Sequence, residues 1–151
     1  MDVADLLSPG HVIAKLPAGD KRTLLTDLAR RAAAATGLRQ SAILEALSGR
    51  EALGSTGVGG GVAIPHARIA GLDRFFGAFA RLERRIDYDA VDEQPVDLVF
   101  LLLVPPHAAN EHLQALACVS RRLRDRSMAD LLRRATDAEA LYAALAGEAG
   151  R

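Results

Sequence analysis

Residues 96–104 have the sequence VDLVFLLLV, an apolar run that lies between Pro95 and the pair Pro105-Pro106. Proline has no backbone N–H to give to a sheet, so the flanking prolines limit the length of a strand. A strand with so many apolar residues in succession is expected to be buried on both faces. The run therefore predicts the central strand of a sheet.

The segments on either side of this strand alternate between helix and strand patterns. A capped amphipathic helix is predicted from Asp20 toward Gly37, because Asp20 suits an N-cap and Gly37 suits a terminator. The other predicted helices run from Ser41 as N-cap to about residue 53, over 110–124, over 127–135 and over 137–146. In the helix over 110–124, the residues expected to face inward are Leu113, Leu116, Ala117, Ser120 and Leu123.

Short strands complete the predicted sheet, over residues 11–16, 62–65 and 75–82. Strands separated by helices favour an α/β sheet, and the adjacent strands between 62 and 82 allow antiparallel pairing. We therefore expect a single α/β domain over residues 1–151, with a mixed central β-sheet flanked by helices.

Composition and charge argue against several classes of protein. The chain has 151 residues, half of them hydrophobic, which suffices for one domain with a core. Nineteen basic and nineteen acidic residues cancel, so no global field favours nucleic acid or an anionic membrane surface. The first residues lack a signal-peptide pattern, and no apolar run is long enough for a spanning helix. Cys118 is the only cysteine and is expected to be buried. We expect a cytoplasmic protein without membrane insertion.

The loop over residues 54–61, GSTGVGGG, is unusual because five of its eight residues are glycine. Such a density costs backbone entropy and indicates unusual dihedral angles or close approach of another molecule. The loop lacks the lysine of a P-loop, and Val62 breaks the dinucleotide pattern. Backbone N–H groups such as that of Gly57, with the hydroxyls of Ser55 and Thr56, would suit a phosphate. The alternative is a glycine-rich hairpin turn at the surface.

His66 follows this loop and comes directly after Pro65, which stiffens the local backbone. A neutral imidazole can attack phosphorus through a ring nitrogen and form a P–N bond that passes the group onward. His66 is therefore a candidate phosphoryl acceptor. The alternative is a histidine that only caps the end of a strand.

Two arginines and a second histidine could assist this acceptor. Arg50 and Arg68 flank the loop, and either guanidinium could bind phosphate oxygens; Arg50 is the better candidate because it lies at a helix end. His112 lies in the first turn of a predicted helix, where the helix dipole disfavours the imidazolium form. His112 is thus expected to be neutral and able to hydrogen-bond to a phosphate or another histidine.

A metal site is not expected. His107, Glu111 and His112 come close to the H-x-x-E-H pattern but have one extra residue, which turns the two rings away from each other. The acidic residues before the central strand are expected to be the solvated rim of a turn; they are Asp87, Asp89, Asp92, Glu93 and Asp97. We expect neither a metal nor a cofactor.

Residues 50–66, REALGSTGVGGGVAIPH, resemble the phosphorylation-site signature of the fructose/mannitol-type enzyme IIA domains (EIIA type 2) of the bacterial phosphotransferase system. The resemblance continues through residues 92–100, 102–105 and 111–113 and covers nearly the whole chain. It is greatest to the stand-alone nitrogen-type member.

This resemblance implies a phosphotransferase that carries phosphate between proteins. His66 would accept the phosphoryl group from an HPr-like phosphocarrier, with Arg50 and His112 as the other active-site residues. Ser55 and Thr56 would border the phosphate.

A regulatory output is favoured, because no membrane segment or second domain accompanies the site in the sequence. The downstream partners would be regulatory protein targets or a separate IIB protein. One alternative is a component of fructose or mannitol uptake, and another is a binding regulator for which phosphorylation is incidental. The modified ring nitrogen and a possible homodimer are left open.

Overall fold

The apolar sequence of β6 (Val96–Val104) is buried along its whole length in the computed structural model, which describes residues 1–147. In that sheet β6 pairs antiparallel with β5 and parallel with β3 and β4, and β1 and β2 form the two ends of the strand order β1-β5-β6-β3-β2. The other strands are β1 (Leu7–Leu16), β2 (Gly57–Gly59), β3 (Val62–Ala63), β4 (His66–Arg68) and β5 (Phe76–Ile86). The sheet is therefore mixed, as predicted.

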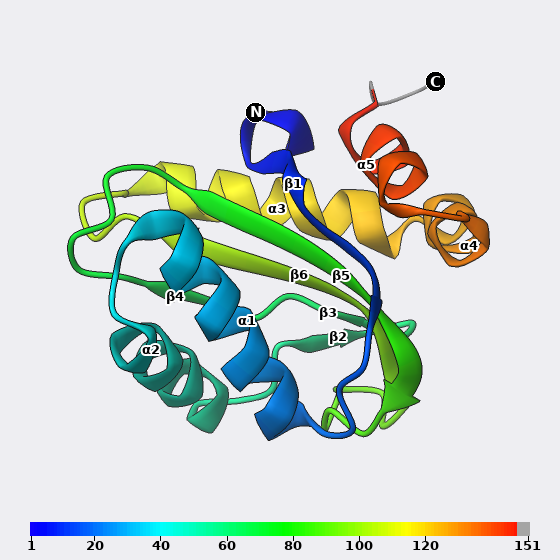
Figure 1. Ribbon diagram of the computed structural model, residues 1–151, viewed down its shortest axis with the longest axis horizontal. Helices are drawn as coiled ribbons and strands as arrows, with labels where there is room; N and C mark the ends of the chain where they lie inside the picture. Colours follow the sequence, from blue (N-terminus) through cyan, green and yellow to red (C-terminus); the bar gives the residue numbers. More distant parts are fainter. Residues whose placement is uncertain (148–151) are drawn as a thin grey trace.

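Helices cover both faces of this sheet (Figure 1). One layer contains α1 (Lys21–Thr36) and α2 (Gln40–Ala52). The other layer contains α3 (Asn110–Arg124), α4 (Arg126–Arg134), α5 (Ala138–Ala146) and a short 3-10 turn, Val3–Asp5. The expected single domain with a mixed sheet flanked by helices is confirmed. Residues 148–151 of the predicted range lie outside the described part of the chain.

The side chains of β6 alternate between the two layers. Leu101 and Leu103 pack with α1 and α2, whereas Phe100 and Leu102 pack with the layer of α3 to α5. All of these side chains are fully buried. This alternation is why one apolar strand serves two cores, and it makes β6 the centre of the molecule.

The termini of α1 and α2 follow different rules. The Asp20 carboxylate accepts a hydrogen bond from the Thr23 backbone N–H at 2.7 Å, and Gly37 ends α1 with a φ of 78°, so both predicted signals are confirmed. The prediction of Ser41 as a cap is wrong. The N-cap of α2 is Arg39, whose carbonyl accepts from the Ile43 N–H, and Ser41 therefore lies inside the first turn.

The inner face of α3 also differs from the prediction. Leu123 is buried as predicted, but Leu113 is 68% exposed and Ala117 is exposed too. The other buried side chains are Ala115, Cys118 and Val119. The small side chain of Ala115 faces the sheet where Leu113 was expected. Cys118 is buried, as predicted.

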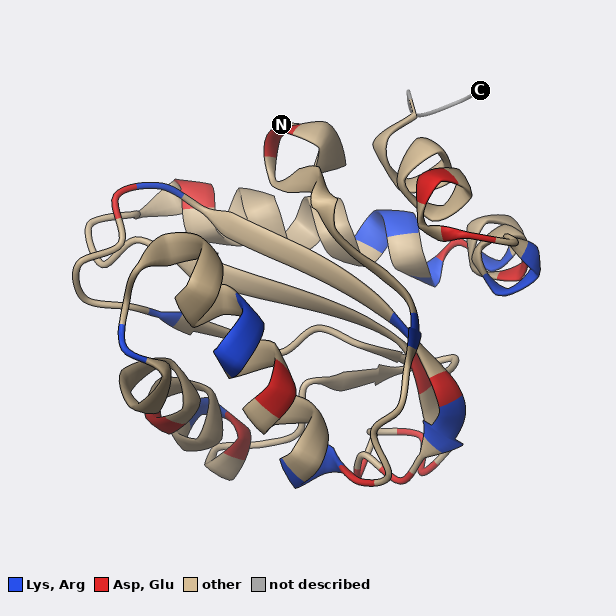
Figure 2. Cartoon of the chain, viewed as in Figure 1, with Lys and Arg blue, Asp and Glu red and all other residues tan. Residues whose placement is uncertain are grey.

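Charged residues lie mainly on the helices, the loops and the second half of β5, from Arg81 onward, and most of the sheet is uncharged (Figure 2). Asp97 is an exception, since it lies within β6 and is only 8% exposed. Its expected place in a solvated rim is wrong because Arg133 of α4 covers it. The Arg133 guanidinium donates to both carboxylate oxygens, at 2.8 and 2.9 Å, and also to the Gly60 carbonyl.

The glycine loop is partly the hairpin that the sequence left as an alternative. β2 and β3 pair antiparallel, and the turn between them places Gly60 and Gly61 at positive φ, 67° and 80°. The Gly60 N–H donates to the Asp92 carboxylate, so this amide is used within the protein. A side chain at Gly61 would be strained by the positive φ at this position, and its Cβ would press against the Arg133 guanidinium that binds Asp97.

Candidate functional site

His66 is the first residue of β4 and lies beside the central strand. β4 pairs with β6 in register His66 with Leu102, and the carbonyl of Pro65 accepts from the Leu102 N–H at 2.9 Å. The backbone on both sides of the imidazole is therefore tied to the most buried strand. This placement explains why a histidine that follows a loop of glycines has a fixed backbone.

One hydrogen bond sets the tautomer of His66. Its Nδ1 lies 2.7 Å from the carbonyl oxygen of Ile64. A carbonyl only accepts, so Nδ1 carries the proton and Nε2 keeps its lone pair. Burial lowers the pKa of the partly buried imidazole, and the nearby Arg50 charge lowers it further, while the bond to Ile64 opposes both effects. His66 is therefore neutral near pH 7, with an unprotonated Nε2.

His112 lies edge-on to His66, with the two ring centroids 5.9 Å apart. It lies in the first turn of α3, as predicted. Burial, Arg68 and His66, in that order, lower the pKa of His112. Within residues 1–147 its buried Nε2 has no hydrogen-bond partner. A buried polar atom of this kind is suited to a ligand that arrives at the site.

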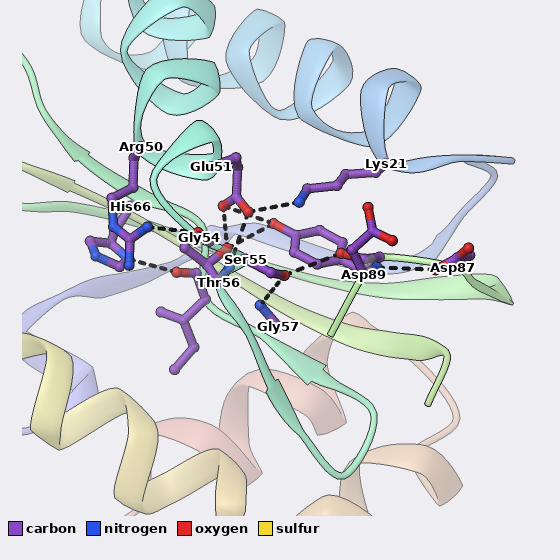
Figure 3. A network of polar contacts seen from close by, with 12 residues as sticks. Lys21, Arg50, Glu51, Gly54, Ser55, Thr56, Gly57, His66, Asp87 and Asp89 are labelled. Atoms are coloured by element: carbon purple, nitrogen blue, oxygen red, sulfur yellow. Dashed lines mark hydrogen bonds and ion pairs between the residues drawn. The ribbon is translucent and has the colours of Figure 1, made fainter. Parts of the chain in front are cut away.

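The structure separates the two arginines that the sequence left as candidates. Arg50, at the end of α2, lies next to His66 and donates to the Gly54 carbonyl at 2.8 Å (Figure 3). Arg68 instead donates to the carbonyls of the loop before α3, the shortest contact being with Ala108 at 2.6 Å. Arg50 is thus the arginine beside His66, and Arg68 holds the loop that leads to His112.

The predicted phosphate-binding residues form many internal contacts. Thr56 is 3% exposed, and its hydroxyl donates to Glu51. The Gly57 N–H donates to the Ser55 hydroxyl at 3.1 Å, and that hydroxyl donates to the carbonyl of Tyr88. These bonds shape the loop, and direct contact of the three residues with a phosphate stays a prediction.

Glu51 is the main residue of the site that the sequence reasoning missed. Its carboxylate accepts from the Thr56 N–H at 3.0 Å, from the Thr56 hydroxyl and from the Lys21 ammonium at 2.8 Å (Figure 3). The buried Tyr88 hydroxyl lies 3.3 Å away. Glu51 follows Arg50 in the sequence, but its importance depends on contacts with distant elements, which no local pattern records.

The described part of the chain contains no group of three or more His, Cys, Asp or Glu side chains that could hold a metal ion. A search of the helices within residues 1–147 likewise finds none long and apolar enough to cross a membrane. The groups beside the His66 ring are the His112 imidazole and the Arg50 guanidinium, which together suit an anionic group.

Residues 5–147 match the family described as "Phosphoenolpyruvate-dependent sugar phosphotransferase system, EIIA 2", and the chain belongs to this family of phosphocarriers. Among its relatives is the "Nitrogen regulatory protein" of Bradyrhizobium diazoefficiens, which is 48% identical over 146 residues, covering 97% of this chain and 95% of the relative. The resemblance to the nitrogen-type member is confirmed.

Solved structures agree with this assignment. The nitrogen regulatory protein IIA-Ntr of Neisseria meningitidis superposes with a TM-score of 0.90 at 36% identity, covering 95% of this chain and 98% of that one. Enzyme IIA-Mtl of Escherichia coli, solved in complex with phosphorylated enzyme IIB-Mtl, superposes with a TM-score of 0.78 at 18% identity, covering 94% and 98%. The second likeness shows the fold alone.

Proposed function

We propose that this chain accepts a phosphoryl group on Nε2 of His66 from the phosphohistidine of an HPr-like phosphocarrier. The observation that carries the proposal is the geometry of His66, whose Nδ1–H is bound to Ile64 and whose Nε2 keeps a lone pair beside Arg50 and His112. A bond forms between Nε2 and phosphorus as the P–N bond of the donor breaks. The proton on Nδ1 of His66 stays in place, and the donor imidazole leaves as a neutral ring when its other nitrogen carries a proton, so the transfer itself moves no proton.

Arg50 and His112 would stabilise the transferred group. The Arg50 guanidinium can donate to phosphate oxygens, which is the main demand that phosphoryl transfer makes on a protein. The unpartnered His112 Nε2 can donate to the phosphate once this nitrogen carries the ring proton. The same contacts would hold the phosphohistidine until it is transferred or read by a partner.

A regulatory output is the favoured use of this phosphate. The Bradyrhizobium relative, which covers nearly the whole chain, is named as a nitrogen regulatory protein. Phosphate on His66 would change the charge at one surface and thereby change which protein binds there. The second candidate is transfer to a separate IIB protein, which the complex of the mannitol-type neighbour with phosphorylated IIB supports. Restored sugar uptake in a strain that lacks its own IIA would favour this candidate.

The test of acceptance is incubation with phosphoenolpyruvate, enzyme I and an HPr-like carrier. We expect an acid-labile, alkali-stable adduct on the wild-type chain that is absent from His66→Ala. His107→Ala is the matched control, because His107 is an exposed histidine outside the site. Failure of the wild type to take up phosphate, or uptake by His66→Ala, would overturn the proposal.

A further inference from the structure

The Glu51 carboxylate accepts two hydrogen bonds from a single loop residue, Thr56. One carboxylate oxygen accepts from the Thr56 backbone N–H at 3.0 Å, and the other accepts from the Thr56 hydroxyl. The Glu51 side chain is 8% exposed. Since carboxylate hydrogen bonds in a buried site are strong and directional, the Thr56 peptide has little freedom to rotate.

The Thr56 peptide is in turn bonded to the residue that sets the tautomer of His66. The Thr56 carbonyl accepts from the Ile64 N–H at 2.9 Å, and the Ile64 carbonyl accepts from His66 Nδ1–H at 2.7 Å. A series of hydrogen-bonded residues therefore links Glu51 through Thr56 and Ile64 to the imidazole. The links act through backbone position: when Glu51 releases Thr56, the Ile64 carbonyl that Thr56 helps to hold can shift.

Two further residues hold Glu51 itself. The Lys21 ammonium of α1 lies 2.8 Å from the carboxylate and 4.4 Å from the centre of the Tyr88 ring. The Tyr88 hydroxyl is fully buried and lies 2.9 Å from that of Thr56. The carboxylate is thus fixed by α1 and by the segment after β5, on the side away from His66 (Figure 3).

We infer that Glu51 is the positioning residue for His66, acting through the hydrogen-bond chain of Thr56 and Ile64. It holds the Ile64 carbonyl where only the Nδ1-protonated tautomer of His66 fits, and so it keeps Nε2 ready for attack. The part of this inference that concerns the reaction rate rests on the proposed phosphoryl transfer. The part that concerns the tautomer does not.

Two substitutions of Glu51 separate the contacts from the charge. In Glu51→Gln the side-chain carbonyl can still accept from the Thr56 N–H. The side-chain NH₂ group can donate to the Thr56 hydroxyl oxygen, because a hydroxyl accepts as well as donates. In Glu51→Ala both hydrogen bonds with Thr56 are lost. Asp27→Ala is the control, because Asp27 also pairs with cations on α1, at Arg30 and Arg31, but takes no part in the site.

Thr56 provides a second pair of variants should Glu51→Ala fold poorly. Thr56→Val removes the hydroxyl and keeps the N–H, whereas Thr56→Ser keeps both donors. We expect Thr56→Val to lie between wild type and Glu51→Ala in both measurements, and Thr56→Ser to match wild type.

The measurements are the ¹⁵N signals of the His66 ring in the unphosphorylated protein and the rate of phosphorylation at saturating donor. We expect the Nδ1–H tautomer to dominate in wild type, Glu51→Gln and Asp27→Ala, and a mixture of tautomers in Glu51→Ala. The rate in Glu51→Ala should fall by roughly 10- to 100-fold with an unchanged KM for the donor.

Equal tautomers and rates in wild type and Glu51→Ala would overturn the inference. A loss in Glu51→Gln as large as in Glu51→Ala would overturn it too, because the charge would then matter and the contacts would not. If the wild type takes up no phosphate, the proposed function fails, while the ring signals still decide whether Glu51 positions His66.

Discussion

The charge state of His66 responds to the two residues at the end of α2 in opposite directions. The Arg50 guanidinium lowers the pKa of His66, and the Glu51 carboxylate raises it. We expect Arg50→Gln to raise this pKa and Glu51→Gln to lower it further, as measured by NMR titration of the ring carbons. Arg39→Gln, at the exposed far end of α2, is the control and should leave the titration of His66 unchanged.

Both site histidines link stability to pH. The pKa of His66 and that of His112 are lowered from the ordinary 6.5, so the unfolded chain takes up these protons at a higher pH than the folded protein. The two histidines therefore have no effect on the free energy of unfolding above about pH 6.5, and they lower it as the pH falls below that value.

His112→Gln removes one of these two groups. Its melting temperature should fall less than that of wild type between about pH 7.5 and about pH 5.5, although its stability at the higher pH can also differ. An equal or larger fall in the variant would contradict this account.

At the scale of elements, the bond between Asp97 and Arg133 attaches α4 to the sheet and to the β2–β3 hairpin. Asp97→Ala leaves the partly buried guanidinium without its carboxylate, and we expect the free energy of unfolding to fall by about 2 kcal/mol. Asp130→Ala, an exposed residue of α4, should change it by less than about 0.5 kcal/mol. Chemical denaturation measures both, and equal values would show that the pair contributes little.

Elements with strong local signals could be predicted from the sequence. The prolines around β6 and the Asp20 cap of α1 act within a few residues, so the predicted limits agree with the structure. The face of α3 could not be predicted, because the residues it buries, such as Ala115, pack in one core with strand residues that are distant in the sequence. Asp97 was misplaced for a similar reason, since its partner Arg133 is distant in the sequence.

The residues of the candidate site also differ in how far they could be predicted from local sequence. Arg50, His66 and His112 were proposed from the motif and its resemblance, and the structure brings all three side chains together. Glu51 was not predicted as a site residue although it lies within that motif, because its contacts are with Lys21 and Tyr88, which are distant in the sequence. The role of a residue with long-range contacts can be inferred only once the fold is known.

At the scale of the whole molecule, the balance of charge makes phosphorylation easy to detect. The chain has a formal net charge of zero and a pI near 6.9. A phosphohistidine adds roughly −1.5 to −2 charges, by analogy with other phosphorylated side chains. We expect isoelectric focusing after incubation with the donor to show a new band at lower pH, absent from His66→Ala. A band that shifts in both proteins would place the phosphate on another residue.

The anchoring of His66 beside β6 has a consequence for the order of events in the proposed relay. The Pro65–Leu102 hydrogen bond and the pairing with β6 hold the backbone of His66, and the bond to the Ile64 carbonyl holds its ring. In the proposed relay, donor and recipient must both reach Nε2 of His66 in the same place. The two proteins therefore cannot bind at this surface together. Binding of the donor and binding of the target are then mutually exclusive. An abundant unphosphorylated donor competes with the target for the surface around His66.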